Sequence, residues 1–137
     1  MPLVTISLTE SFSATKQRAI ADGVHDAIVA AGFPATDRFQ KVLRLPADRL
    51  IYDPLHPDLP ESRSEQFVLV ELLLSKGRSG EFKRDLMKSI VANLARNPRV
   101  DPRDVMVVIL ETERENWAFS AGVQYYVESE GRQTSDA

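Results

Sequence analysis

The chain has 137 residues, of which 43% are hydrophobic and 27% charged, a composition typical of one soluble globular domain. Its net charge is −3, from 17 basic and 20 acidic residues spread along the chain, so no basic face for nucleic acid is expected. The sequence has no cysteine, which excludes disulfides and thiolate chemistry, and no stretch approaches the roughly 20 apolar residues of a membrane span. We therefore expect a cytoplasmic protein without a nucleic-acid or membrane partner.

The first 45 residues predict a strand, a helix and a second strand. β-Branched and leucine residues over 3–8 predict a strand that begins almost at the amino terminus. Ser13 is a typical N-cap, and the helix that follows it should end at Gly32 and Pro34. Apolar positions recur along this helix at helical spacing: Ile20, Val24, Ile28 and Ala31. Residues 39–45 predict the second strand, which a right-handed crossover makes parallel to the first.

The second half of the chain repeats this plan. Residues 67–74 predict a buried strand, Ser79 caps a helix that ends at Asn97 and Pro98, and residues 105–110 predict a fourth strand. This second helix has its own apolar face: Phe82, Leu86, Ile90 and Leu94. A shift of 66 residues, from 13 to 79, relates the halves in several pairs: Ser13 and Ser79, Ile20 and Leu86, Val24 and Ile90, Ile28 and Leu94, Phe39 and Val105. The match indicates a duplicated strand-helix-strand unit, although shared periodicity alone also produces such matches.

These elements predict a single α+β domain over residues 1–127, with a four-stranded mixed sheet and two helices on one face. The strands over 67–74 and 105–110 are apolar on both faces, so two helices leave apolar sheet surface uncovered, and we expect a homotrimer whose other subunits cover it. Residues 46–65 hold four of the eight prolines and form either a lid or subunit contact, or a plain surface loop. The polar tail over 128–137 should fray.

The predicted topology brings reactive groups to one edge of the sheet. Pro2 and Asp37 precede the two strands of a parallel pair, so they lie near one another. If strands one and three are antiparallel neighbours, the end of the third strand delivers Lys76 and Arg78 to the same edge. Arg78 also precedes the second helix, whose N-terminal N–H groups and dipole favour an anion. We therefore expect a carboxylate-binding pocket beside Pro2.

Pro2 has a specific chemical use if Met1 is removed, because its nitrogen then becomes a secondary amine. An α-amino group titrates at about 7.7–8.0, and burial or neighbouring cations lower that pKa. The neutral amine can then act as a general base. His25 and His56 are isolated histidines, so no metal site is assigned, and no phosphate loop or Ser-His-Asp pattern is present.

Four short motifs follow Pro2 in order along the chain: Phe33-Pro34, Asp37-Arg38-Phe39-Gln40, Lys76-Gly77-Arg78-Ser79 and Asn116-Trp117-Ala118-Phe119. With Pro2 they resemble the malonate semialdehyde decarboxylase branch of the tautomerase superfamily, over nearly the whole chain to about residue 127. The resemblance implies a duplicated strand-helix-strand fold, a trimer and chemistry without a cofactor.

The resemblance also implies roles for individual residues. Asp37 would assist proton or water handling, a pair of arginines would hold the substrate carboxylate, and Trp117 and Phe119 would wall the pocket. Arg78 matches the second of these arginines, whereas Lys76 replaces the first and loses the planar fork that binds a carboxylate through two hydrogen bonds.

The leading interpretation is cofactor-independent tautomerisation of a small enolisable 2-oxo acid, with Pro2 as general base and Arg78 and Lys76 on the carboxylate. One alternative is decarboxylation of a 3-oxo acid such as malonate semialdehyde by a protonated Pro2, and another is a trimeric scaffold with a vestigial pocket. Each candidate residue also has a structural alternative: a turn residue for Asp37, loop charges for Lys76 and Arg78, core or interface aromatics for Trp117 and Phe119.

Overall fold

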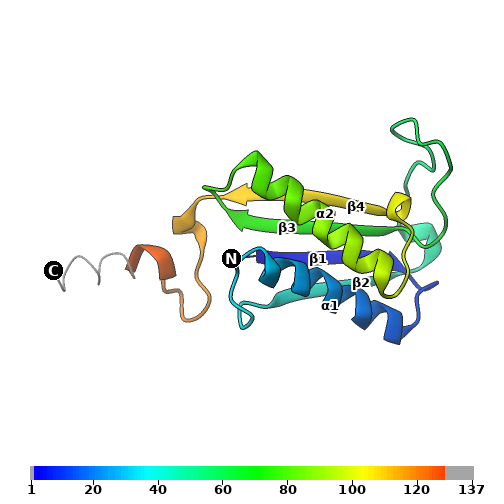
Figure 1. Cartoon of the computed structure of the whole chain (residues 1–137). Helices are drawn as coiled ribbons and strands as arrows, with labels where there is room; N and C mark the ends of the chain where they lie inside the picture. Colours follow the sequence, from blue (N-terminus) through cyan, green and yellow to red (C-terminus); the bar gives the residue numbers. More distant parts are fainter. Residues whose placement is uncertain (1, 129–137) are drawn as a thin grey trace.

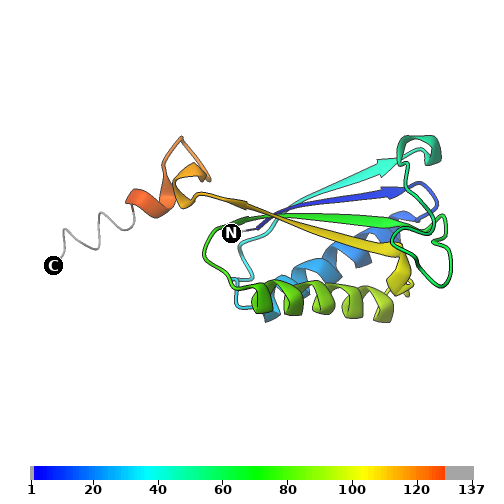
Figure 2. The same cartoon turned by 90° about the horizontal axis from the view of Figure 1, so that it is seen from above.

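The computed structural model describes residues 2–128, which form a sheet with two long helices on one of its faces (Figures 1 and 2). The principal elements are β1 (Pro2–Thr9), α1 (Ala14–Ala30), β2 (Phe39–Leu45), β3 (Val68–Ser75), α2 (Gly80–Arg96) and β4 (Val105–Thr112). Short 3-10 helices lie between and after them, at Ala47–Arg49, Pro102–Asp104 and Arg114–Asn116. This α+β arrangement confirms the predicted fold class. Met1 and residues 129–137, most of the predicted tail, lie outside the described range.

The sheet order β2-β1-β3-β4 places the two halves of the chain side by side. β1 is parallel to β2 and antiparallel to β3, and β3 is parallel to β4. The starts of β1 and β2 therefore lie at the same end of the sheet as the ends of β3 and β4. We call this the Pro2 end, and Figure 1 shows it next to the chain start.

Both helices begin at the predicted serine caps. Ser13 accepts a hydrogen bond from the backbone N–H of Lys16, and Ser79 accepts one from Phe82. After α1, Gly32 adopts a φ of +113°, a left-handed conformation that favours glycine at a helix end. The helices and alternate strand residues enclose the core, whose largest fully buried side chains include Phe12, Ile6, Ile20, Leu72, Leu86 and Ile90.

The shift of 66 residues holds for the inner strands but not for the outer ones. Val4 and Val70, which are 66 apart, both face the helices and are fully buried. Phe39 pairs with Leu3 on the helix-free face, whereas Val105 pairs with the buried Val68. The predicted equivalence of Phe39 with Val105 is therefore wrong. Val4 pairs with Gln40 and its counterpart Val70 pairs with Val107, so the outer strands correspond with a shift of 67.

The helix-free face of the sheet is largely apolar, as expected from the strand sequences. In the single chain Phe39 and Met106 are each 46% exposed and Leu110 is 48% exposed. The register places further apolar side chains on the same face: Leu3, Leu43, Leu69, Leu73 and Val108. Within residues 2–128, no helix is long and apolar enough to cross a membrane.

The proline-rich residues 46–65 pack at the end of the sheet opposite to the Pro2 end, because β2 runs away from it (Figure 1). Ser64 donates from its N–H and its hydroxyl to the buried carboxylate of Asp104, at 2.7 Å in both cases. Tyr52 stacks on Phe67 with ring centroids 4.2 Å apart and donates to the Ser64 carbonyl at 2.6 Å. Within one chain this segment is therefore fixed to the domain and does not border Pro2.

Candidate functional site

Pro2 and Asp37 lie at the Pro2 end on neighbouring strands. Pro2 is buried and pairs with Leu74, and the following Leu3 pairs with Phe39, two residues after Asp37. Asp37 is 7% exposed and its N–H donates to the Pro34 carbonyl at 3.0 Å, which closes a turn. Burial raises the pKa of this carboxyl above 3.8, and the positive charge of His25 acts in the opposite direction. The predicted proximity of Pro2 and Asp37 thus follows from the register.

Arg78 is held at the same end by contacts on both its edge and its face. Its Nη1 donates to the Ser75 carbonyl at 2.9 Å and to the Ser75 hydroxyl at 3.3 Å. The guanidinium carbon lies 4.5 Å from the ring centroid of Phe33 and 5.7 Å from that of Phe82, which are cation–π distances. Gly77, with a φ of +118°, forms the turn that brings Arg78 back over these rings. These contacts hold the guanidinium plane in one orientation.

Lys76 lies in the same turn but has a different partner. Its backbone N–H donates to the Thr112 carbonyl at 2.9 Å, and its exposed ammonium forms an ion pair with Glu113. The hydrogen bond that the Lys76 ammonium donates to Glu113 raises the pKa of Lys76. A role for Lys76 on a substrate carboxylate, which remains a prediction, requires the ammonium to exchange Glu113 for the substrate.

Trp117 and Phe119 line a pocket of about 310 Å³ at the Pro2 end, on the helix-free face. Trp117 Nε1 donates to the Thr112 hydroxyl at 2.6 Å, which fixes the indole. Phe119 stacks between Trp117 and Phe39, with centroids 5.9 Å from each. Leu3, next to Pro2, lies in the same wall. Pro2, Asp37 and Arg78 are not among the described residues that line this cavity, so the role of Trp117 and Phe119 as walls of the substrate pocket stays a prediction.

Tyr126 is a further site residue that the sequence reasoning missed. Burial raises the pKa of its phenol, and the negative charge of Asp37 adds to this effect. The charge of Arg78 and a hydrogen bond with Ser75 lower the pKa instead, so the phenol lies within electrostatic reach of both candidate catalytic side chains.

A small hairpin positions Tyr126. Ala118 forms a β-bridge with Gln124, and the Tyr125 N–H donates to the Trp117 carbonyl at 3.2 Å. The Tyr126 ring meets Phe119 edge-on, with centroids 6.3 Å apart. The adjacent tyrosines after the Trp-Phe motif were the only sequence signal, because this segment has no helical or strand periodicity to predict where it folds.

The assembled groups offer acid–base and anion-binding chemistry. The buried Pro2, a carboxyl with a raised pKa, a guanidinium held by Ser75 and a phenol lie at one end of the sheet. Between residues 2 and 128, no three His, Asp or Glu side chains gather as a metal-binding group.

Comparison with known proteins agrees with this geometry. Residues 37–120 match the family described as Tautomerase enzyme. The chain is 24% identical over 129 residues to the probable tautomerase YusQ of Bacillus subtilis (strain 168), covering 93% of this chain and 100% of that protein. FG41 malonate semialdehyde decarboxylase inhibited by 3-bromopropiolate is 34% identical, with a TM-score of 0.87 over 93% of this chain and 96% of that chain. A fused 4-OT symmetric trimer, at 19% identity, shares the fold with a TM-score of 0.72 over 88% of this chain and 94% of that chain.

The family match spans more than half of the chain and includes Asp37, Arg78, Trp117 and Phe119. The resemblance to the tautomerase superfamily, and to its malonate semialdehyde decarboxylase branch, is confirmed by the family match and by the 34% identity. This chain belongs to the tautomerase family of enzymes.

Proposed function

We propose that this protein is a cofactor-independent tautomerase of a small enolisable 2-oxo acid. The observation that supports this function best is the burial of Pro2 at the start of β1, at the same sheet end as Asp37 and Arg78. Removal of Met1 converts the Pro2 nitrogen into a secondary amine within this group. The amine takes the proton from the carbon next to the carbonyl, the electron pair moves to the carbonyl oxygen, and the resulting enolate is protonated on oxygen.

Arg78 is the principal partner of the substrate carboxylate in this mechanism. Since Nη1 is directed to Ser75, Nη2 and Nε supply further N–H groups on the same plane. Its positive charge also stabilises the developing enolate and lowers the pKa of the Pro2 amine, which keeps the amine neutral. Lys76 adds a second cation when it leaves Glu113. The Tyr126 phenol supplies a donor for the enolate oxygen.

Decarboxylation of a 3-oxo acid is the second candidate, and the 34% identity to FG41 malonate semialdehyde decarboxylase favours it. In this reaction a protonated Pro2 polarises the carbonyl, the bond to the carboxylate carbon breaks, and carbon dioxide leaves. The electron pair forms an enolate that is then protonated on carbon. The two reactions demand opposite protonation states of Pro2, so one titration distinguishes them.

We also propose that the active assembly is a homotrimer. The apolar helix-free face, with Phe39, Met106 and Leu110 nearly half exposed, is surface that other subunits would cover. A relative that shares the fold is a fused 4-OT symmetric trimer. Native mass spectrometry should show three subunits, and a single species at the monomer mass of 15.3 kDa would refute the trimer.

The function is tested on the purified protein in three measurements. Intact mass should show loss of one methionine. Ultraviolet assays should show interconversion of the enol and keto forms of 2-oxo acids, and NMR titration of the Pro2 nitrogen should give a pKa below about 8. A pKa well above 8, with turnover of 3-oxo acids alone, would establish the decarboxylase instead. A fully retained Met1 would remove both mechanisms and favour a scaffold with a vestigial pocket.

A further inference from the structure

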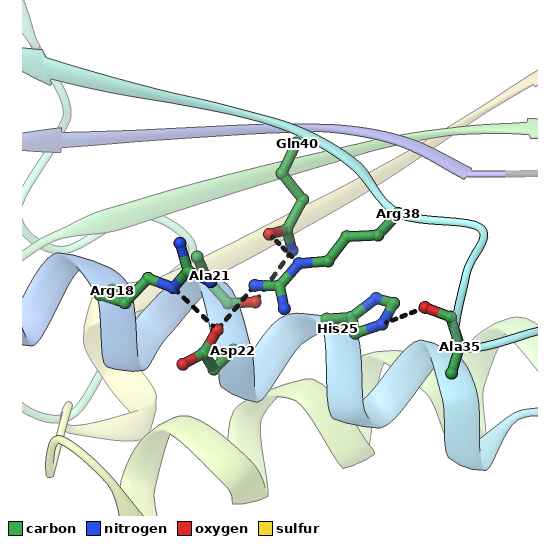
Figure 3. A network of polar contacts seen from close by, with 7 residues as sticks. All are labelled: Arg18, Ala21, Asp22, His25, Ala35, Arg38 and Gln40. Carbon is green, nitrogen blue, oxygen red and sulfur yellow. Dashed lines mark hydrogen bonds and ion pairs between the residues drawn. The ribbon is translucent and has the colours of Figure 1, made fainter.

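The turn that presents Asp37 is tied to α1 by a buried histidine. His25 lies on α1 and is 8% exposed, and its Nε2 is 3.0 Å from the Ala35 carbonyl oxygen, two residues before Asp37 (Figure 3). A carbonyl oxygen only accepts hydrogen bonds, so Nε2 carries the proton and donates it. The imidazole is buried, although Ala35 itself is exposed, so loss of this contact would leave a buried N–H without its acceptor.

A second tie holds the turn on the other side of Asp37. Arg38 donates from Nη2 to Asp22 Oδ1 on α1 at 2.7 Å, and from Nε to Gln40 Oε1 at 3.0 Å. Gln40 in turn donates to the Ala21 carbonyl on α1 at 2.8 Å, so α1 is linked both to the turn and to the start of β2 (Figure 3). Asp37 thus lies between two fixed points on one helix.

The two links from the turn to α1 differ in the solvent exposure of their side chains. The Asp22 side chain is 47% exposed and also pairs with the exposed Arg18, so its ion pair with Arg38 is screened by solvent. The donor of the other hydrogen bond, His25, is only 8% exposed, and its acceptor Ala35 belongs to the turn that the N–H of Asp37 closes onto Pro34. His25 therefore controls the position of this turn more strongly than Asp22 does.

We propose that His25 is a positioning residue for Asp37: its hydrogen bond to the Ala35 carbonyl fixes the turn so that the Asp37 carboxyl meets Pro2 and the substrate in one geometry. The role of Asp37 at the substrate rests on the proposed function, whereas the control of the turn by His25 does not. The ionisable side chains that act on Asp37 from elements packed around it include His25 on α1 and Tyr126 in the helical segment over 125–128.

A pair of amide substitutions separates the hydrogen bond from the other properties of the ring. His25→Gln places its Nε2 near the position of the imidazole Nε2, so it still donates to the Ala35 carbonyl. His25→Asn carries the same uncharged amide on a shorter side chain that does not reach this oxygen. Asp26→Asn, on an exposed position of α1, is the matched control for an asparagine in this helix.

We expect His25→Gln and Asp26→Asn to keep kcat within about threefold of the unsubstituted protein. His25→Asn should lower kcat on the order of tenfold to a hundredfold with little change in KM, because the reacting group is misplaced rather than substrate binding lost. Exchange of the Asp37 amide hydrogen should be about tenfold faster in His25→Asn than in His25→Gln, because the turn opens more often. All variants are compared below their measured melting temperatures.

Equal exchange rates of the Asp37 amide in the Gln and Asn variants would overturn the proposal, whatever the activity. If exchange differs but no variant, including the unsubstituted protein, converts any 2-oxo or 3-oxo acid, the positioning of the turn stands and the proposed function fails. If His25→Asn does not fold, folded His25→Gln still decides: a tenfold loss of kcat there would show that the imidazole acts by something other than this hydrogen bond.

Discussion

Replacement of Arg78 by alanine is the most direct test of the site. The substitution removes the guanidinium that lies 4.5 Å from the Phe33 centroid and bonds to Ser75, along with the charge proposed to stabilise the enolate. Loss of one preorganised transition-state partner lowers the rate on the order of 10² to 10³, or about 2.7–4 kcal/mol of activation free energy. We therefore expect kcat/KM for a 2-oxo acid to fall by this factor in Arg78→Ala.

Arg78→Lys measures how much of that factor belongs to the planar fork. It keeps the charge but loses one charge-assisted hydrogen bond, so a fall in kcat/KM of about tenfold is expected, from about 1.5 kcal/mol. Arg84→Ala removes an exposed cation from α2, the helix that follows Arg78, and should leave kcat/KM unchanged.

The assay follows the decay of the enol absorbance at saturating and limiting substrate, after thermal melting shows that each variant is folded. A folded Arg78→Ala protein within threefold of the original kcat/KM would refute the assignment of Arg78 to the transition state.

Three further substitutions test other contacts. Because burial raises the pKa of Asp37 above 3.8, its contribution to stability is present at lower pH and is lost as pH rises through the raised pKa. Asp37→Asn, which resembles the protonated form, should therefore raise the melting temperature more at pH 7 than at pH 4 while it lowers turnover; an equal effect at both pH values would contradict the raised pKa. Tyr126→Phe removes the hydroxyl that acts near Ser75 and should lower kcat/KM about tenfold, from one lost hydrogen bond, so an unchanged value would remove Tyr126 from the site. Asp104→Asn weakens two 2.7 Å bonds from Ser64 and should cost about 1–2 kcal/mol in chemical denaturation, with no change in turnover.

The sequence predicts the regular elements because their signals are local. Ser13 and Ser79 cap the two helices as expected, since a serine side chain meets the N–H groups of the next turn within the same segment. The placement of Pro2 and Asp37 at one sheet end also follows from strand order and handedness. Those parts of the site that depend on topology can therefore be predicted from the sequence.

Contacts between loops that are far apart in the sequence cannot be predicted in this way. The stacking of Arg78 on Phe33 depends on how the α1–β2 turn and the β3–α2 turn approach each other, which no periodicity encodes. Lys76 had the expected charge and position, but its pairing with Glu113 is set by the end of β4. Tyr126 lies in a helical segment that directly follows the isolated bridge between Ala118 and Gln124, around which the sequence has no strand pattern.

The one-residue difference between the inner-strand and outer-strand shifts determines which residues of the two halves correspond. With the outer-strand shift of 67, the counterpart of Asp37 is Asp104, and both are buried. Asp37 lies two residues before the start of β2 and Asp104 lies directly before β4, at opposite ends of the sheet. The inner-strand counterpart of Pro2 is Val68, in mid-chain, where no amine exists. The pseudo-twofold axis between the halves thus relates the Pro2 end to an opposite end, at which Ser64 donates two hydrogen bonds to the Asp104 carboxylate. A circular permutation that starts the chain at Val68 would place the terminal amine at this opposite end. The Asp104 carboxylate would still be hydrogen-bonded to Ser64 there, so the amine would lack a carboxylate equivalent to Asp37 until Ser64 moved away.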